Sequence, residues 1–454
     1  MQVSIPATQL NAWLAGELLP PPTSQLSSLT AQDEQLRPIK LFSLNDYLGL
    51  STHPEVCKAA ADAALACGNG PRSSALVGAE ECLLFPTGFA ANLAVVSSLC
   101  VDGNVAVFSD ELNHASIVDG ARLGRRHGTR LSVYRHNDLH HLEELLAATP
   151  SGMRRLVITD TLFSMDGDFA DLQGLVDLKR KHDFLLAIDD AHGTLVCGDN
   201  GGGAAEMLGV DQGIDLHVGT LSKAFGCMGG FVACSARWKD FLVNRGRSQV
   251  YSTALPVPVV AAAHAALRVA AQEPWRRRHL WRLTGQLGSS LGIRTHSPIV
   301  PLVLGSEQAT LSASSQLLAR GFHVPAIRPP TVPQGTSRLR VSLSAGHSSA
   351  DVELLVAALQ DCGVQCLPLD RLGRVLGTAG AAAGAAGAAS SMERAADVIS
   401  MSGWRAQQGW HGGVVGTQQA GRQQLPGLLE GGEAAEAGGA AVQLMECTAA
   451  RARL

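Results

Sequence analysis

The sequence predicts an α/β fold in which a mostly parallel sheet lies between two layers of helices. Short, continuously apolar runs bounded by Asp, Gly and Thr occur at 105–108, 156–158, 185–188 and 217–218. Between them lie stretches with helical spacing of apolar residues, such as 172–181. Apolar strands that alternate with helices are typical of a parallel sheet covered on both faces. Ligands of such sheets bind at the carboxyl ends of the strands, so we expect the chemistry there.

The composition fits this fold class and excludes several functions. The chain has 454 residues, of which 46% are apolar, and a formal net charge of −4. The absence of a dense Lys/Arg block argues against a nucleic-acid groove, and no apolar run reaches the roughly 18–20 residues that cross a bilayer. Ten cysteines without a C-x-x-C pair predict reduced, mostly buried thiols. We therefore expect no nucleic-acid partner, no membrane span and no bound metal.

Changes in composition divide the chain into four parts. The Ala/Gly/Gln-rich end of the chain has too few large apolar residues to offset its ordering entropy, so we expect it to be disordered. A change to a charged helical pattern near 272–278 predicts the start of a second domain. The four parts are an N-terminal segment (1–39), a large domain (40–271), a smaller C-terminal α+β domain (272–370) and a tail (371–454).

The terminal residues bear on where the protein acts. Residues 1–36 contain no Lys or Arg, so we expect neither a secretory signal nor an Arg-rich mitochondrial presequence. The last three residues, Ala452-Arg453-Leu454, resemble a peroxisomal address, although so short a motif also arises by chance. We expect a cytoplasmic protein, with a peroxisomal location as the alternative.

Lys223 differs in its surroundings from the other five lysines. It lies in the segment 219–230, which is rich in glycine and small residues and contains no other charge. A lysine in an apolar pocket has a lowered pKa, and its neutral amine can attack a carbonyl carbon. A loop lysine beside a turn is the alternative interpretation of the same pattern.

Asp189 follows the apolar run 185–188, where an unpaired carboxylate would be costly. A protonated pyridine nitrogen is a suitable partner, because an aspartate keeps such a ring cationic. Taken alone, Asp189 fits a helix N-cap better. Together with His192 and the downstream Lys223, it predicts a pyridoxal-phosphate site.

Six motifs, in order along the chain, resemble those of the α-oxoamine synthases, which are pyridoxal-phosphate enzymes of the fold-type-I aminotransferase superfamily. The resemblance extends from about residue 40 to 365, and it implies a large domain with a mostly parallel sheet and a smaller C-terminal α+β domain. The motifs are Asn45-Asp-Tyr-Leu-Gly-Leu-Ser, Phe108-Ser-Asp-Glu-Leu-Asn-His-Ala-Ser, Phe163-Ser-Met-Asp-Gly-Asp, Asp189-Asp-Ala-His-Gly-Thr, Thr220-Leu-Ser-Lys-Ala-Phe-Gly and Arg328-Pro-Pro-Thr-Val-Pro.

Two segments indicate the branch of the family. Arg328-Pro-Pro-Thr-Val-Pro and Pro71-Arg-Ser-Ser-Ala-Leu-Val resemble the plant-type branch that condenses L-alanine with pimeloyl-CoA in biotin biosynthesis. Sister enzymes of the glycine C-acetyltransferase or 5-aminolevulinate synthase type remain the nearest alternative. The resemblance also implies a homodimer, because the segment 251–256 corresponds to one that reaches the phosphate of the neighbouring subunit.

The resemblance implies pyridoxal 5'-phosphate (PLP) as the cofactor and gives roles to particular residues. Lys223 holds the cofactor covalently and moves the substrate proton, Asp189 pairs with the pyridinium nitrogen, and His114 stacks on the ring. These are the expected catalytic residues. The others are Gly88, Phe89 and Thr220 at the phosphate, Ser164 beside the ring, His192 at the phenolic oxygen, Arg340 at the substrate carboxylate and Thr331 in the acyl pocket.

The sequence departs from the family pattern after Gly78. Family members carry an amphipathic helix there, whereas Gly78 continues directly into the segment 79–88. Either the gene model has lost an exon or the protein is a catalytically impaired homologue. The intact motifs on both sides favour the first explanation.

Overall fold

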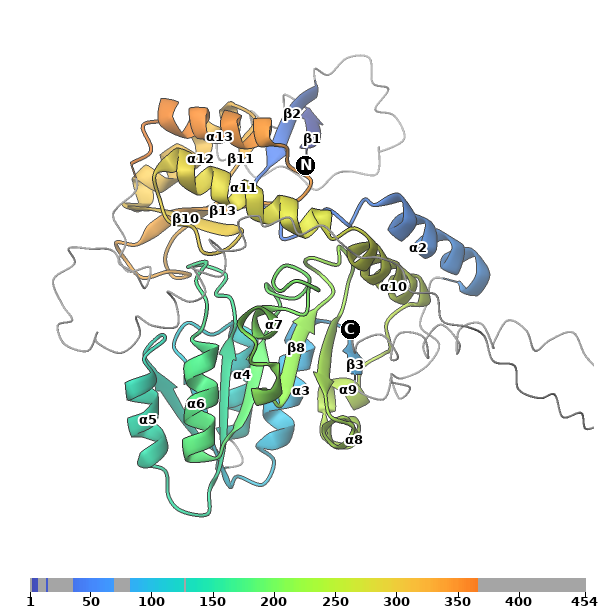
Figure 1. Cartoon of the computed structure of the whole chain (residues 1–454), viewed down its shortest axis with the longest axis vertical. Helices are drawn as coiled ribbons and strands as arrows, with labels where there is room; N and C mark the ends of the chain where they lie inside the picture. The colour runs from blue at the N-terminus through green and yellow to red at the C-terminus, as the bar shows by residue number, and fades with distance from the viewer. Residues whose placement is uncertain (1, 7–13, 15–35, 69–81, 126–127, 366–454) are drawn as a thin grey trace, which may run out of the picture. The chain divides into compact units, whose positions relative to one another are not determined.

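The computed structural model describes residues 2–6, 14, 36–68, 82–125 and 128–365, and its largest sheet has seven strands in the order β3-β9-β8-β7-β6-β4-β5 (Figure 1). Strands β8, β7, β6, β4 and β5 are parallel, whereas β9 runs antiparallel to both β8 and β3. The predicted mostly parallel sheet is therefore confirmed. The strands are β3 (Cys82–Phe85), β4 (Val105–Asp110), β5 (Arg130–Tyr134), β6 (Arg154–Asp160), β7 (Leu185–Asp189), β8 (Leu216–Thr220) and β9 (Gly230–Cys234).

Helices pack on both faces of this sheet, because alternate strand residues point into two separate cores (Figure 1). Val107 and Ala187 belong to the core that contains residues of α3 (Gly88–Leu99), α4 (Ala115–Arg125) and α8 (Ala236–Arg245). Phe108 and Ile188 belong to the core that contains residues of α5 (Leu139–Ala147), α6 (Leu172–His182) and α7 (Ala204–Leu208). Burial on both faces explains why the strands are uninterrupted apolar runs.

Helix α6 shows how closely a local pattern can predict an element. The helix expected over 172–181 spans Leu172–His182. The Asp171 side chain accepts a hydrogen bond from the Gly174 N–H at its start, and Asp183 ends it in the left-handed conformation, with φ of 47°. Both signals lie within a few residues of the helix itself.

The second predicted domain contains the sheet β10-β13-β12, formed by β10 (Ile299–Gly305), β13 (Ser337–Ser342) and β12 (Ala326–Ile327). The helix expected across 272–278 is instead interrupted: α10 (Val257–Gln272) ends before Glu273-Pro274, and α11 (Trp275–Leu291) follows. Proline disfavours helical geometry at the residue before it, which explains the break. The boundary between 40–271 and 272–370 stays a prediction.

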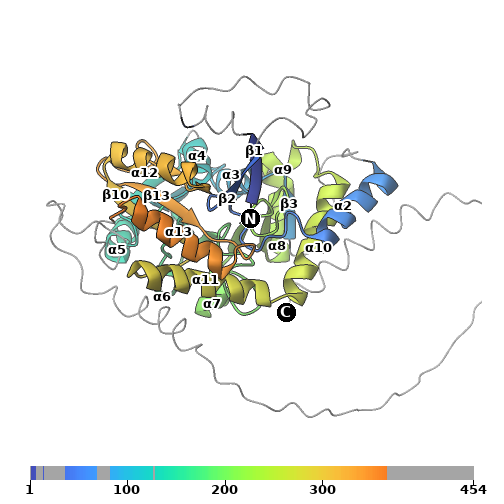
Figure 2. The same cartoon turned by 90° about the horizontal axis from the view of Figure 1, so that it is seen from above.

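The remaining elements complete the described part of the chain. A third sheet has the order β1-β2-β11, and α2 lies beside α10 in both views (Figures 1 and 2). These elements are β1 (Gln2–Pro6), β2 (Leu36–Leu41), α2 (Pro54–Cys67), η1 (Asp211–Gly213), α9 (Arg247–Val250), α12 (Glu307–Ala319), β11 (Phe322–His323) and α13 (Ser349–Asp361).

Several predicted features lie outside the described residues. They are the tail (371–454) with Ala452-Arg453-Leu454, the segment 71–77 and the discontinuity after Gly78. Within the described ranges, no helix is long and apolar enough to cross a membrane, and no cluster of three or more His, Cys, Asp or Glu residues is placed to hold a metal ion. Of the cysteines described, only Cys100 and Cys197 are buried, so the prediction of mostly buried thiols is wrong.

Candidate active site

Asp160 and Asp189 lie side by side at the carboxyl ends of β6 and β7, where they are register partners. Both side chains are buried. Asp189 follows Ala187 on the face of the sheet that α3 covers, and the Asn92 amide of α3 donates to its Oδ2 at 2.6 Å. The Ala191 N–H donates to Oδ1 at 2.9 Å. These two hydrogen bonds fix the direction of the Asp189 carboxylate.

Lys223 follows β8 in the connection to β9. Burial lowers the pKa of its amine, the charges of Asp189 and Asp160 raise it, and the charge of Arg340 lowers it further, with a net lowering. The amine therefore lies within electrostatic reach of both strand-end carboxylates. It also gives up its proton more readily than an exposed lysine does.

His114 lies in the loop after β4. Its backbone N–H donates to Asp160 Oδ2 at 2.7 Å, and its Nδ1 lies 2.7 Å from Ser116 Oγ. Burial lowers the pKa of the imidazole. The charge of Asp189 raises this pKa and the charge of Lys223 lowers it, and the net effect is a lowering. A neutral imidazole close to both groups is suited to stacking on an aromatic ring.

His192 lies on the loop after β7, and its Nδ1 is 2.7 Å from the Tyr47 hydroxyl. Burial, followed by the charges of Lys223 and Arg340, holds the pKa of His192 well below its usual range. Burial also raises the pKa of Tyr47 to about 12. Both groups are therefore neutral at pH 7 and can only donate or accept hydrogen bonds there.

The N-terminus of α3 packs closely against the end of β8 and the start of β9. A Cβ on Gly88 would lie 3.2 Å from Thr220 Cβ, and a Cβ on Gly230 would lie 2.5 Å from Gly88 N, so this approach needs glycine. The Thr87 side chain accepts from the Ala90 N–H at 3.0 Å. The first-turn N–H groups of Gly88 and Phe89 have no partner within the helix, which makes this end suited to an anion such as a phosphate.

Arg340 lies on β13 with its side chain buried. Its Nε donates to the Ser164 carbonyl oxygen at 2.5 Å, and its terminal nitrogens lie 3.2 and 3.3 Å from Asn45 Oδ1. No carboxylate pairs with this guanidinium in the part of the chain that the structure describes. A buried cation whose neighbours are neutral acceptors is suited to a carboxylate ligand.

The structure brings most of the predicted site residues together. Lys223, Asp189, His114, His192 and Arg340 act electrostatically on one another. Gly88 and Phe89 lie beside this set of residues. Gly88 packs against Thr220, and the Phe89 ring meets the His114 ring edge-on, with centroids 6.3 Å apart.

Thr331 is the exception among the predicted residues. It is exposed, and its N–H donates to the Arg328 carbonyl oxygen. Within the described ranges, no backbone hydrogen bond joins Thr331 to another predicted site residue. Its place in an acyl pocket therefore stays a prediction.

Four residues in contact with the site were missed by the sequence analysis. Asn45 and Tyr47 lie in a motif that supported the resemblance, but no role was given to them. Asp160 ends an apolar strand just as Asp189 does, and that position was the available signal. Asn92 lies one helical turn from Gly88 in a pattern that otherwise indicates an ordinary buried helix.

The arrangement fits PLP on its own chemistry. The close approach of glycines at the start of α3 suits a phosphate, the oriented Asp189 carboxylate suits a pyridinium nitrogen, and the buried Lys223 amine suits an aldehyde. A lysine and a strand-end aspartate on such a sheet define the class of fold-type-I PLP-dependent enzymes.

Comparison with known proteins gives the family. The family model for aminotransferase class I and II matches residues 35–359. The 8-amino-7-oxononanoate synthase of Arabidopsis thaliana is 48% identical over 398 residues, covering 80% of this chain and 83% of that protein. The enzyme of the same name from Anaeromyxobacter dehalogenans strain 2CP-1 is 48% identical over 339 residues, covering 69% and 84%.

A solved structure adds the fold and the cofactor. Serine palmitoyltransferase from S. paucimobilis, with PLP–myriocin bound, has a TM-score of 0.68 and 29% identity over 73% of this chain and 90% of that one. The chain belongs to the aminotransferase class I and II family and, within it, to the α-oxoamine synthases, which are PLP-dependent acyltransferases.

The alignment with the Arabidopsis relative also bears on the discontinuity after Gly78. It extends over 398 positions, yet it covers 80% of the 454 residues of this chain, which is fewer than 398 residues. The relative therefore has residues that lack a counterpart here. That these residues belong after Gly78 stays a prediction.

Proposed function

We propose that this chain catalyses the decarboxylative condensation of L-alanine with pimeloyl-CoA, the 8-amino-7-oxononanoate synthase reaction of biotin biosynthesis, which releases CoA and CO2. The observation that carries the proposal is the 48% identity to the Arabidopsis enzyme of that name over most of both chains. The site is consistent with an amino-acid substrate, because Arg340 is buried with neutral hydrogen-bond acceptors and its charge acts on Lys223.

The geometry of the site supports the roles that we propose. Bound PLP supplies an electron sink for negative charge at the amino-acid Cα. The Lys223 amine would hold the cofactor covalently and would take the Cα proton, since burial favours its neutral form. The Asp189 carboxylate, oriented by Asn92, would keep the ring nitrogen protonated, and His114 would pack against the ring.

Substrate binding is assigned to Arg340. Its guanidinium would bind the alanine carboxylate, with the Ser164 carbonyl and Asn45 amide oxygens holding the side chain in place.

Replacement of Arg340 by lysine is expected to raise the KM for L-alanine about 10–100-fold, because a charge-assisted hydrogen bond is worth about 1.5–3 kcal/mol. Steady-state kinetics with pimeloyl-CoA held at saturation measures this change. Arg338 on the same strand pairs with Asp166 at 2.6 Å, so Arg338→Lys is the matched control and should leave the alanine KM unchanged. An equal rise in both variants would contradict the role of Arg340.

We also propose a homodimer. Phe89, Met228 and Tyr251 are large apolar side chains around the phosphate end of the site, and they are 41%, 53% and 73% exposed in a single chain. Helix α9, which precedes Tyr251, contacts the start of α3, since Ser248 Oγ donates to the Ala90 carbonyl oxygen at 2.5 Å. A second subunit would cover these side chains and complete the site.

The location in the cell stays part of the proposal. We propose a cytoplasmic location. A peroxisomal location, directed by Ala452-Arg453-Leu454, is the alternative. Those three residues lie outside the described part of the chain.

The purified holoprotein is expected to form 8-amino-7-oxononanoate from L-alanine and pimeloyl-CoA, as measured by mass spectrometry of the product. Glycine with succinyl-CoA should give no product. Turnover of the glycine pair alone would assign a sister enzyme of the family. Stoichiometric PLP binding without turnover of either pair would favour the catalytically impaired homologue.

A further inference from the structure

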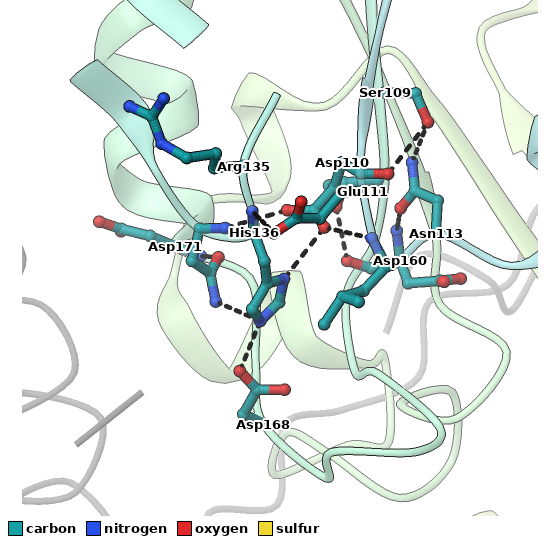
Figure 3. A network of polar contacts seen from close by, with 12 residues as sticks. Ser109, Asp110, Glu111, Asn113, Arg135, His136, Asp160, Asp168 and Asp171 are labelled. Atoms are coloured by element: carbon teal, nitrogen blue, oxygen red, sulfur yellow. Dashed lines mark hydrogen bonds and ion pairs between the residues drawn. The ribbon is translucent and has the colours of Figure 1, made fainter. Parts of the chain in front are cut away.

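His136 is buried between two aspartates that come from different segments at the carboxyl edge of the large sheet (Figure 3). Its Nδ1 lies 3.0 Å from Asp110 Oδ1, and its Nε2 lies 2.8 Å from Asp168 Oδ2. Its side chain is 7% exposed. None of these three residues takes part in the roles proposed above.

The ring of His136 is cationic at neutral pH. Burial alone would lower the pKa of the imidazole, but hydrogen bonds to Asp110 and Asp168, together with their charges, outweigh burial and raise the pKa to about 10. Both ring nitrogens therefore carry a proton and donate at the same time. A doubly donating imidazolium fixes the distance between the two carboxylates that accept from it.

The first carboxylate belongs to the segment that carries His114. Asp110 Oδ1 also accepts from the Leu112 N–H at 2.9 Å, and the Asp110 carbonyl oxygen accepts from the Asn113 N–H at 3.2 Å. The Asn113 amide in turn donates to the Ile158 carbonyl oxygen at 2.8 Å. The turn from Asp110 to His114 is thus fixed at its first residue by His136.

The second carboxylate belongs to the segment that carries Ser164. The Phe163 N–H donates to the Asp168 carbonyl oxygen at 3.0 Å, and the Phe163 ring meets the His136 ring edge-on, with centroids 4.4 Å apart. The Ser164 carbonyl oxygen accepts from Arg340 Nε at 2.5 Å. This segment therefore supports the guanidinium assigned to the substrate carboxylate.

Asn137 joins the same two segments. Its backbone N–H donates to Asp110 Oδ2 at 3.0 Å, and its side-chain amide donates to the Phe169 carbonyl oxygen at 2.9 Å. Removal of the His136 side chain would therefore leave part of the connection in place, so that a variant can fold while its site is less precisely arranged.

We propose that His136 is a positioning residue for the PLP-dependent reaction, in that its imidazolium ties Asp110 to Asp168 and so fixes His114 relative to the Ser164–Arg340 pair. The expected effect on L-alanine binding rests on the proposed function. The expected effect on PLP binding does not. A bond that only stabilised the fold would lower the unfolding midpoint and leave the affinities of the folded protein unchanged.

The test compares His136→Gln with the wild type at a temperature at which both are folded. The dissociation constant of PLP, measured by titration of the apoprotein, and the KM for L-alanine should both rise, with kcat/KM falling about 10–100-fold. His323→Gln is the control, because His323 is a half-buried histidine whose Nδ1 contacts Ser43 Oγ at 2.7 Å, outside this network. PLP affinity and alanine KM equal to those of the control would overturn the proposal.

The contributions of Asp110 and Asp168 can be measured separately. Asp110→Asn should raise mainly the dissociation constant of PLP, because its segment carries His114. Asp168→Asn should raise mainly the KM for L-alanine, because its segment supports Arg340. Identical effects of the two variants on both constants would contradict this division. If no variant and no wild-type protein turns over alanine, the proposed function fails, while the PLP titrations still decide the positioning role.

A second measurement uses the apoprotein and its stability. Because the folded-state pKa of His136 is raised from 6.5 to about 10, its contribution to stability is complete below pH 6.5 and is lost as the pH rises toward 10. The denaturation midpoint of the wild type should therefore fall by more than that of His136→Gln between pH 7 and pH 9. An equal fall in both proteins would contradict an imidazolium that donates to both carboxylates. The charged or titratable groups that face this network are Asp110, Glu111, Tyr134, Asp160, Asp166, Asp168 and His296.

Discussion

Replacement of Lys223 by alanine is expected to lower kcat at least about 10³-fold, because the variant loses both the amine that holds PLP and the base that moves the Cα proton. The buried amine lies within reach of the Asp189 and Asp160 charges, and its lowered pKa favours the neutral, nucleophilic form. Borohydride reduction of the holoprotein, followed by peptide mass spectrometry, should place the reduced cofactor on Lys223 in the wild type and on no lysine in the variant.

Lys179→Ala is the matched control for this prediction. The Lys179 ammonium pairs with Asp215 at 2.5 Å and donates to the Gly213 carbonyl oxygen at 2.9 Å, so it is a partly buried lysine held by the fold. Its loss should reduce stability and leave the borohydride label on Lys223. A label that stays with the Lys223→Ala protein at stoichiometric yield would contradict the assignment.

The parts of the fold that could be predicted are those whose signals lie close together in the sequence. Helix α6 has its cap at Asp171 and its end at Asp183, so its bounds follow from local residues. The strand-end position of Asp189 follows from the apolar run before it, and this explains why the sequence alone placed it in a site. In the same way, α3 begins at Gly88 directly after Thr87, whose side chain caps the helix.

The contacts that orient the site could not be predicted, because they join residues far apart in the chain. Asn92 and Asp189 are 97 residues apart, and Arg340 and Ser164 are 176 residues apart. His136 reaches aspartates 26 and 32 residues away. A hydrogen bond of this kind depends on how loops pack together at the edge of the sheet. The periodicity of apolar residues in the sequence does not predict that packing.

The neighbouring acids Asp189 and Asp190 show the limit most clearly. The sequence offers two consecutive carboxylates after the same strand. In the structure, Asp190 accepts from the Thr161 hydroxyl at 2.5 Å and the Ala204 N–H at 3.2 Å, so the loop around it uses its oxygens. Burial raises the pKa of Asp190 to about 7. Of these two acids, only Asp189 lies on the face of the sheet that α3 covers. Asp189 is therefore the partner that we propose for a pyridinium nitrogen.

Replacement of Asp189 by asparagine is therefore expected to lower kcat about 10²–10³-fold, the cost of removing a preorganised charge that stabilises the developing transition state. The amide cannot keep the ring nitrogen protonated, so negative charge at the alanine Cα is less well stabilised. Exchange of the L-alanine Cα proton with solvent deuterium, followed by NMR without acyl-CoA, measures this step directly. Asp190→Asn should retain exchange near the wild-type rate and lower only the unfolding midpoint. If Asp190→Asn slowed exchange more than Asp189→Asn, the acid that serves the cofactor would be Asp190.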